Sequence, residues 1–196
     1  MDNLWLIAGL GNPGREYART RHNAGFLVVE EFARRSGLAW GSESRFQARV
    51  AKAATPQGTL VLCMPQTFMN ASGESVGGLA RFFRIHPSHV LVVVDDADLP
   101  LGTIRLRPGG SSGGHHGLDS VEQFLGTRDY PRLRVGIGRR TDGQRDIAGY
   151  VLSPFTVEER PLLEKVLDRC VRQMDCWQVQ GLARAMNLYN GSEDSE

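Results

Sequence analysis

The sequence contains little cysteine, almost no lysine and no long apolar run. Its three cysteines are widely separated and form no C-x-x-C pair, namely Cys63, Cys170 and Cys176. An odd number of dispersed thiols gives neither a disulfide framework nor a zinc site, so we expect a reducing compartment. No apolar stretch approaches the roughly 18 residues that a membrane span needs. The stretch 4–10 also lacks the basic flank of a secretory leader, and we therefore expect a cytoplasmic protein.

The scarcity of lysine leaves arginine as the main cation. Only Lys52 and Lys165 of the 23 basic residues are lysines. Guanidinium groups suit phosphate recognition, but a GC-rich genome also supplies arginine, so composition leaves both explanations open. The apolar fraction of 41% and the charged fraction of 23% are ordinary for a globular protein. For 196 residues we expect a single domain over 1–196, with a frayed tail from about 191 to 196.

Apolar periodicity predicts alternating strands and helices. Strands are expected at 5–8, 60–64, 90–94 and 134–138, and helices at 25–35, 72–83 and 118–125. Residues 46–54 and 58–62 resemble a hairpin. Thr156 and Glu159 match a capping box before a long helix, which Gly181 separates from a short final helix. The alternation favours an α/β three-layer sandwich, with a mixed, largely parallel twisted sheet flanked by helices.

The stretch GLGNPG (9–14) has the G-x-G-x-x-G spacing of a dinucleotide-binding loop. Such a loop needs its third glycine within a helix, then a second strand and an acidic residue about 20 positions further on. Here Pro13 adjoins that glycine, and the acids at that distance fall within a helical pattern. We therefore favour a turn that carries Asn12, Tyr17 and His22 to the carboxyl edge of the sheet, although each could also be an ordinary turn, packing or surface residue.

Further polar residues follow later strands. Phe68 and Asn70 in PQTFMNASG precede a predicted helix, where they also suit a core residue and an N-cap. Asp95, Asp96 and Asp98 stand at the end of the strand predicted to be most buried. These acids could form a metal site, or one of them could lie beside a histidine. No second cluster at ligand spacing supports the metal site, and the acid beside a histidine is simpler. The loop GGSSGGHHGL either approaches a phosphate or is a flexible surface loop.

Together these segments resemble the bacterial peptidyl-tRNA hydrolase family. GLGNPGREYARTRHNAGF, PQTFMNASG, DDADLPLG, GGSSGGHHGL and LRVGIGR occur in the order and spacing of that family, from about residue 4 to residue 189. The resemblance implies an esterase that needs no cofactor. Its substrate would be a peptidyl-tRNA released from the ribosome, cleaved at the ester between the peptide and the terminal ribose.

The resemblance also assigns roles to single residues. It makes His22 the general base, Asp95 the carboxylate that orients it, and Asn12 a residue that distinguishes blocked from free amino groups. Contacts to the tRNA end and the adjoining peptide are implied for Tyr17, Phe68 and Asn70. Acceptor-stem phosphates would meet three arginines, Arg105, Arg107 and Arg134. The long C-terminal helix and the GGSSGG loop, with Trp177 and Gly181 nearby in sequence, are expected to act as a lid over the substrate channel.

One position departs from the family pattern. The motif usually reads G-G-H-N-G, whereas this chain places His116 where the asparagine contacts the tRNA end. An imidazole cannot reproduce the paired donor and acceptor of an amide. We therefore expect a different contact with the substrate there, and His116 adds a second ionisable group to the site.

Several alternatives remain beside the hydrolase. A serine triad is the competing mechanism, but we expect no G-x-S-x-G nucleophile elbow in this sequence. An ester is already activated, so water and a histidine base suffice without a metal. A catalytically impaired RNA-binding protein of the same fold and a nucleotide-dependent enzyme are the rival functions. We expect a monomer with no obligate protein partner and no membrane contact.

Overall fold

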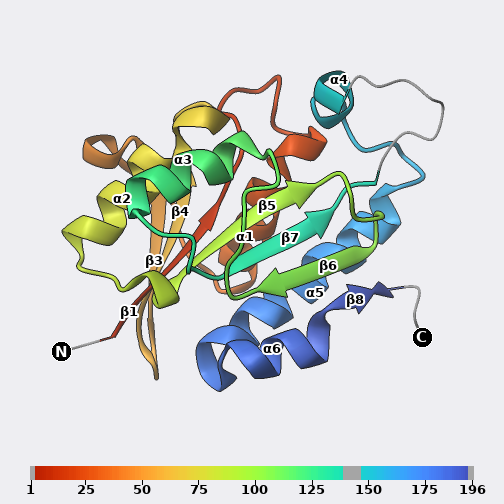
Figure 1. Ribbon diagram of the computed structural model, residues 1–196. Coiled ribbons are helices and arrows are strands. Elements are labelled where there is room, and N and C mark those ends of the chain that lie inside the picture. Colours follow the sequence, from red (N-terminus) through yellow and green to blue (C-terminus); the bar gives the residue numbers. More distant parts are fainter. Residues whose placement is uncertain (1–2, 139–146, 194–196) are drawn as a thin grey trace.

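Figure 1 shows the computed structural model of the chain, which describes residues 3–138 and 147–193. Within these residues one sheet has the strand order β2-β3-β4-β1-β5-β7-β6-β8. The strands are β1 (Leu4–Gly9), β2 (Gly41–Glu43), β3 (Ala48–Thr55), β4 (Gly58–Pro65), β5 (Val90–Asp96), β6 (Thr103–Arg107), β7 (Arg132–Gly136) and β8 (Gly191–Ser192). Neighbours among β4, β1, β5 and β7 are parallel, whereas β2, β3, β6 and β8 pair antiparallel at the two edges. The expected mixed sheet is confirmed.

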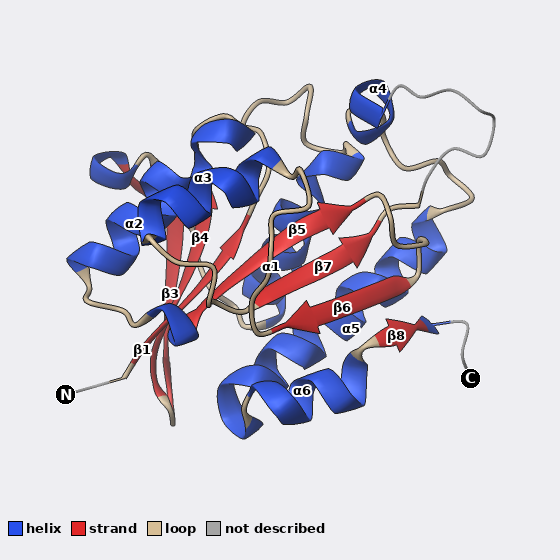
Figure 2. Cartoon of the chain, viewed as in Figure 1, coloured by secondary structure: helices blue, strands red, loops and turns tan. Residues whose placement is uncertain are grey.

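Helices cover both faces of this sheet (Figure 2). On one face lie α2 (Ser72–Phe82) and α3 (His116–Leu125), and on the other α1 (Ala24–Arg35), α5 (Arg160–Gln180) and α6 (Leu182–Tyr189). The central strands send alternate residues to the two sides, as Ile7 and Val93 join one buried cluster while Leu6 and Val92 join the other. This alternation explains why the central strands are apolar throughout, and it confirms the three-layer sandwich.

Most predicted elements are present, with ends that differ by a few residues. The strand expected at 134–138 is β7, which begins at Arg132, and α3 begins at His116 instead of Leu118. The hairpin is β3 and β4. Strand β6 was not predicted, although its alternating sequence TIRLR is typical of a half-buried strand. Strand β2 and the short helix α4 (Ile147–Val151) were not predicted either, and single 3-10 turns occur at Arg21–Asn23, Ser44–Phe46, Met69–Ala71 and Pro87–His89.

The C-terminal region packs against the sheet and extends it. Helix α5 packs against α1 and β6, and Trp177 is buried with its ring 5.0 Å from that of Trp5 near the amino end of β1. This end of α5 therefore lies away from the carboxyl edge of the sheet, and the expected lid over the substrate channel stays a prediction. Gly191 and Ser192 were expected in a frayed tail but pair with β6, while 194–196 lie outside the described residues. No helix in the described parts of the chain has the length and hydropathy to cross a membrane.

The glycine loop after β1 does not lead directly into a helix, because α1 begins only at Ala24. This excludes the dinucleotide-binding geometry. Gly9 and Gly25 instead allow α1 to approach the sheet closely. A Cβ on Gly9 would lie 2.2 Å from the carbonyl oxygen of Gly25, and one on Gly25 would lie 2.3 Å from that of Val93. The loop and the turn before α1 are thereby held at the carboxyl ends of β1 and β5.

Candidate active site

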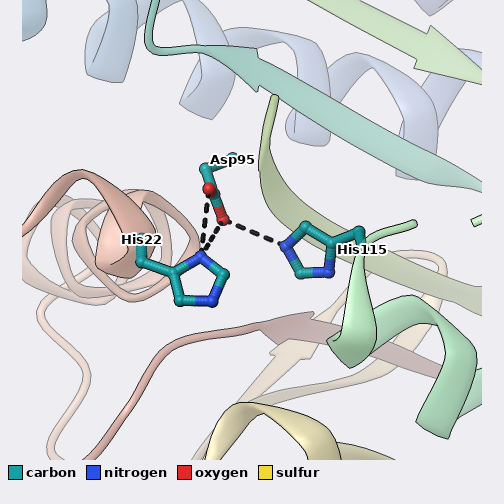
Figure 3. A group of neighbouring side chains, drawn as sticks. All are labelled: His22, Asp95 and His115. Carbon is teal, nitrogen blue, oxygen red and sulfur yellow. Dashed lines mark hydrogen bonds and ion pairs between the residues drawn. The ribbon is translucent and has the colours of Figure 1, made fainter. Parts of the chain in front are cut away.

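Three side chains meet at this edge of the sheet, as Figure 3 shows. The Nδ1 atom of His22 lies 2.9 Å and 3.0 Å from the two carboxylate oxygens of Asp95. The Nε2 atom of His115 lies 3.0 Å from Oδ1 of the same carboxylate. The two imidazole rings are 5.3 Å apart and tilted by 47°. One carboxylate thus contacts two histidines that are far apart in the sequence.

The strand register explains why Asp95 faces His22. Asp95 has the same parity as Val93, whose side chain belongs to the cluster beneath α1, so it points to the α1 side of the sheet. His22 lies in the 3-10 turn directly before α1. The Thr20 hydroxyl donates to the Tyr17 carbonyl at 2.9 Å and closes the preceding turn. Because β1 and β5 are parallel neighbours, their carboxyl ends bring the two residues together.

The hydrogen bonds of His115 fix its tautomer. Its Nδ1 atom accepts the backbone N–H groups of Gly117 at 3.1 Å and Leu118 at 3.3 Å, which makes it the N-cap of α3. An atom that accepts these bonds carries no proton, so the ring proton lies on Nε2 and is donated to Asp95. His115 therefore links the start of α3 to the carboxylate.

Asp95 is buried, and its charge depends on these two histidines. Burial raises the pKa of Asp95, but the hydrogen bonds from His115 and His22 outweigh it and lower the pKa to about 2. The carboxylate is consequently ionised at neutral pH. A charged carboxylate beside Nδ1 of His22 holds the proton on that atom and leaves Nε2, on the far side of the ring, with a free lone pair.

Asn12 is held beside these residues by a second set of hydrogen bonds. Its backbone N–H donates to Oδ1 of Asn23 at 2.8 Å, and Nδ2 of Asn23 donates back to the Asn12 carbonyl at 2.9 Å. The side-chain Oδ1 of Asn12 accepts the Met69 N–H at 2.8 Å. This fixes the orientation of the amide, and its Nδ2 has no hydrogen-bond acceptor among residues 3–138 and 147–193.

A cavity of about 530 Å³ lies next to the three polar residues. This volume is in the range of small-molecule sites. Its polar lining includes Asn12, His22, Asp95, Asp96, His115, His116 and Arg134, and its apolar lining includes Val94, Ala97, Leu118, Ile147, Val151 and Leu152. Three of the lining residues belong to α4, namely Ile147, Ala148 and Val151. This helix lies beside the turn that carries His22.

The sequence-predicted residues fall into two groups. His22, Asp95, Asn12, His116 and Arg134 line the cavity. His116 is 81% exposed at its rim, with Nδ1 3.7 Å from a carboxylate oxygen of Asp119.

The remaining predicted residues lie outside the cavity lining, namely Tyr17, Phe68, Asn70, Arg105 and Arg107. Phe68 is 62% exposed, and Asn70 is exposed in the turn that Asn12 holds. Tyr17 is partly buried in the loop after β1.

The three predicted phosphate-binding arginines are not equivalent. Arg134 donates to Asp96 at 3.1 Å and to the Ser111 carbonyl at 3.0 Å, so its guanidinium already has partners within the protein. Arg105 and Arg107 are exposed on β6, and neither has an ion-pair partner in the described part of the chain. Being two residues apart on one strand, they share a face and lie roughly 7 Å from each other.

The three clustered residues have the side-chain types of a metal site, which their sequence spacing did not indicate. The hydrogen bonds disagree with that use. A metal ion on Nε2 of His115 would have to displace the proton donated to Asp95, while Nδ1 is already occupied by two N–H donors. His115 thus has no free lone pair for a metal ion. The cluster fits a carboxylate that accepts hydrogen bonds from two histidines better than it fits a metal centre.

The expectation about serine needs a correction. The G-x-S-x-G spacing does occur, at Gly109–Gly113 and again at Gly110–Gly114. It lies in the long loop between β6 and α3, not on a sharp strand-to-helix elbow. The Ser112 hydroxyl accepts the Gly114 N–H at 3.3 Å, and neither serine hydrogen-bonds to His22 among the described residues. The geometry of a serine triad is therefore not formed.

Two residues of the site were not predicted. His115 is the second hydrogen-bond partner of Asp95, and Asn23 hydrogen-bonds to the backbone of Asn12. His115 stands in a quoted motif directly before a predicted helix, and an imidazole at an N-cap position was the available signal. Asn23 follows His22 and could have been considered an N-cap for α1. Neither contact is visible in sequence spacing, because each joins segments that meet only in the folded chain.

Comparison with known proteins agrees with this geometry. The peptidyl-tRNA hydrolase family model matches residues 6–196. The peptidyl-tRNA hydrolase of Desulfitobacterium hafniense (strain Y51) is 50% identical over 185 residues, which cover 94% of this chain and 98% of that protein. That of Gloeobacter violaceus is 46% identical over 187 residues, covering 95% and 94%. The crystal structure of the enzyme from Acinetobacter baumannii has a TM-score of 0.90 at 35% identity and covers 98% of this chain and 97% of that one. The chain belongs to the peptidyl-tRNA hydrolase family.

Proposed function

We propose that His22, supported by Asp95, activates a water molecule that hydrolyses the ester bond of peptidyl-tRNA. The chain is a hydrolase of this substrate class by its family membership. The observation that carries the assignment of His22 is the 2.9 Å bond from its Nδ1 to an ionised, buried carboxylate, which leaves Nε2 as the basic atom beside the cavity. A positioned base of this kind contributes about 10²–10⁴ to the rate.

The proposed reaction has two steps. Nε2 of His22 takes one proton from water while the water oxygen bonds to the ester carbonyl carbon, giving a tetrahedral oxyanion and a His22 imidazolium that Asp95 stabilises. The carbon–oxygen bond to the ribose then breaks, and the ribose oxygen takes the proton from His22. The products are the free peptide, with a carboxyl group, and the tRNA with its terminal hydroxyl restored.

Asn12 supplies a hydrogen-bond donor in this scheme. Its Oδ1 is held by the Met69 N–H, so its Nδ2 is the group that remains for the substrate carbonyl or the developing oxyanion. A donor placed in advance costs no reorganisation when the charge forms, and removal of such a donor typically costs about 3 kcal/mol in activation free energy.

The tRNA end is proposed to enter beside the turn at Met69–Ala71. Phe68 is exposed there and offers a ring on which an unpaired base can stack, with Tyr17 and Asn70 as neighbouring contacts. Arg105 and Arg107 would meet acceptor-stem phosphates, because both are exposed cations without an ion-pair partner in the described residues. Arg134 could contribute only by exchanging its bonds to Asp96 and Ser111.

The working state proposed for this chain is a cytoplasmic monomer without an obligate protein partner. All residues of the proposed mechanism come from one chain, so catalysis does not require a second copy. The alternative, an RNA-binding protein that has lost catalysis, has no observation in its favour, since the base, its carboxylate and the amide lie together at the cavity.

The test is hydrolysis of an N-acetylated aminoacyl-tRNA and of its unblocked counterpart, with wild type and His22→Ala. We expect release from the blocked substrate only, and a fall of about 10²–10⁴ in kcat for the variant. His86→Ala is the matched control, because His86 is exposed and its side chain hydrogen-bonds only to Ser88 in the described chain. Undiminished activity of His22→Ala, or equal cleavage of both substrates, would refute the assignment.

A further inference from the structure

The residue directly before His22 makes an unusual set of contacts. The Arg21 side chain is only 5% exposed and does not line the cavity. It donates to both carboxylate oxygens of Glu159, at 3.0 Å and 2.8 Å. Its guanidinium carbon lies 4.6 Å from the ring centroid of Tyr150 and 5.0 Å from that of Phe155. A buried arginine bound in this way is anchored on several sides at once.

These partners lie in α4 itself and in the segment that follows it, since Tyr150 belongs to α4 and Phe155 and Glu159 come after it. The Arg21 backbone N–H donates to the Ser153 carbonyl at 3.0 Å, and its Nε donates to the Ser153 hydroxyl at 3.3 Å. Thr20 forms an isolated antiparallel bridge with Pro154. The turn that carries His22 and the segment 150–159 are therefore fastened together through backbone and side chain.

Helix α4 depends on such outside support. It has five residues, none of them buried, whereas isolated helices shorter than about 12 residues are marginal in water. It nevertheless supplies Ile147 and Val151 to the wall of the cavity, with Leu152 directly after it. The Tyr150 hydroxyl donates to the Ile137 carbonyl at 2.7 Å, so Tyr150 is held by the end of β7 as well as by Arg21.

Glu159 connects the same arginine to α5. Its carboxylate accepts the Thr156 N–H at 2.7 Å, and the Thr156 hydroxyl accepts the Glu159 N–H at 3.3 Å, which is the predicted capping box. Burial raises the pKa of Glu159, but the bonds from Arg21 and the Thr156 N–H outweigh it and lower the pKa. The pair is thus charged, and removing one member leaves a buried charge without its partner.

We propose that Arg21 is a positioning residue that fixes the apolar α4 wall of the cavity relative to His22 and thereby sets the affinity for the acyl group of the substrate. The wall is apolar and partly exposed, with Ile147 51% and Leu152 44% accessible, so it suits an apolar side chain on the amino acid next to the ester. Arg21 touches no reacting atom in this scheme. The inference rests on the proposed function, because it assumes that the acyl group occupies this cavity.

The experiment compares N-acetyl-leucyl-tRNA with N-acetyl-glycyl-tRNA for wild type, Arg21→Lys and Glu159→Gln. Lysine keeps the charge but cannot reach both carboxylate oxygens, and glutamine keeps the shape of Glu159 without its charge. For both variants we expect KM for the leucyl substrate to rise about tenfold, the effect of losing the contact of about one methylene group in an apolar pocket. The kcat should stay within about twofold of wild type. The glycyl substrate should change little, so the preference for leucyl falls about tenfold.

Arg34→Lys is the matched control, because Arg34 binds both oxygens of Glu31 at 2.8 Å and 2.7 Å but is 70% exposed on α1. It should leave KM and the preference unchanged. Circular dichroism at the assay temperature establishes that each variant is folded, and if Arg21→Lys is not, Glu159→Gln carries the test alone. An unchanged KM and preference would overturn the proposal, as would a fall in kcat with an unchanged KM. Absence of hydrolysis by the wild type would instead refute the proposed function.

Discussion

Asp95 is the residue on which the proposed site depends most. Both of its carboxylate oxygens accept hydrogen bonds from imidazole N–H groups, so an amide in its place would present an N–H to one ring. If that N–H faces His22, it favours the His22 tautomer that carries its proton on Nε2. The atom beside the cavity can then no longer accept a proton from water. The shape of the side chain would be retained while the direction of proton transfer is lost.

We therefore expect Asp95→Asn to lower kcat on N-acetyl-aminoacyl-tRNA by about 10²–10⁴, with KM changed only a few-fold. Steady-state kinetics with a folded variant measure both parameters. Asp129→Asn, an exposed site on the loop before β7, is the control and should behave as wild type. A kcat within threefold of wild type would show that the carboxylate does not orient the base.

The same carboxylate links stability to acid pH. Its pKa is about 2 in the folded protein, below the ordinary value of 3.8. A depressed pKa stabilises the fold above the unfolded value, and this contribution is lost as pH falls from about 4 towards about 2. The full contribution is on the order of 2 kcal/mol. The test is denaturant unfolding of wild type and Asp95→Asn between pH 6 and pH 2. The free energy of unfolding of wild type should fall relative to that of Asp95→Asn as the pH falls through that interval. A constant difference between the two proteins would contradict the linkage.

At the residue scale the sequence predicted the groups but not all of their contacts. His22, Asp95 and Asn12 stand in quoted motifs, and their meeting follows from parallel strands that end at one edge. The role of His115 in holding Asp95 depends on where a loop of several glycines returns to the sheet. Gly110, Gly113 and Gly114 all adopt positive φ there, a path that sequence spacing does not specify.

At the scale of elements, α3 and the site share one residue. His115 caps the helix through Nδ1 and binds Asp95 through Nε2, so a change there affects two properties that suitable variants can separate. Asparagine is among the best N-cap residues but is too short to replace the imidazole at Asp95, whereas alanine performs neither role.

His115→Ala should lower the free energy of unfolding by about 1 kcal/mol, and His115→Asn should recover most of that loss. Both should reduce kcat, because each removes a hydrogen bond that helps to hold the Asp95 carboxylate. Thermal or denaturant unfolding and steady-state kinetics on the same samples measure the two effects. The neighbouring variant His116→Asn, at an exposed rim position, is the control for stability. Full activity of His115→Asn would mean that the contact with Asp95 is dispensable.

The elements that sequence patterns predicted are those with a strong period. The predicted helix 72–83 agrees closely with α2, because its apolar residues recur with the helical period of 3.6 residues. The predicted strand 90–94 agrees closely with β5, because a short continuous apolar run is typical of a buried strand. Helix α4 has too few residues for a period to appear, and its conformation depends on Tyr150 and the Arg21 contacts. The place of α5 on the sheet could not be predicted for a related reason, since an amphipathic pattern shows that a helix packs but not against which part of the sheet.

For the whole molecule, the position of Arg105 and Arg107 relative to the cavity would determine how the RNA is held. The cavity opens at the carboxyl ends of β1 and β5, and β6 lies beyond β7 on the same sheet. Arg105 on β6 lies opposite Arg134 on β7 in the register, so a row of guanidinium groups leads from β6 towards the cavity. A duplex stem lying along β6 would place its single-stranded end near His22.

Phosphate contacts of this kind are recognised by their dependence on salt. Each neutralised phosphate contributes about 0.7–0.9 to the slope of the logarithm of binding against the logarithm of salt concentration. Arg105→Ala with Arg107→Ala should therefore reduce the slope of log(kcat/KM) against log[KCl] by about 1.5, leaving kcat at saturating substrate unchanged. Arg34→Ala removes an exposed arginine from α1 on the other face and should leave the slope as it is. If the double variant keeps the wild-type slope, the stem does not lie along β6, and the acceptor phosphates must be held elsewhere on the molecule.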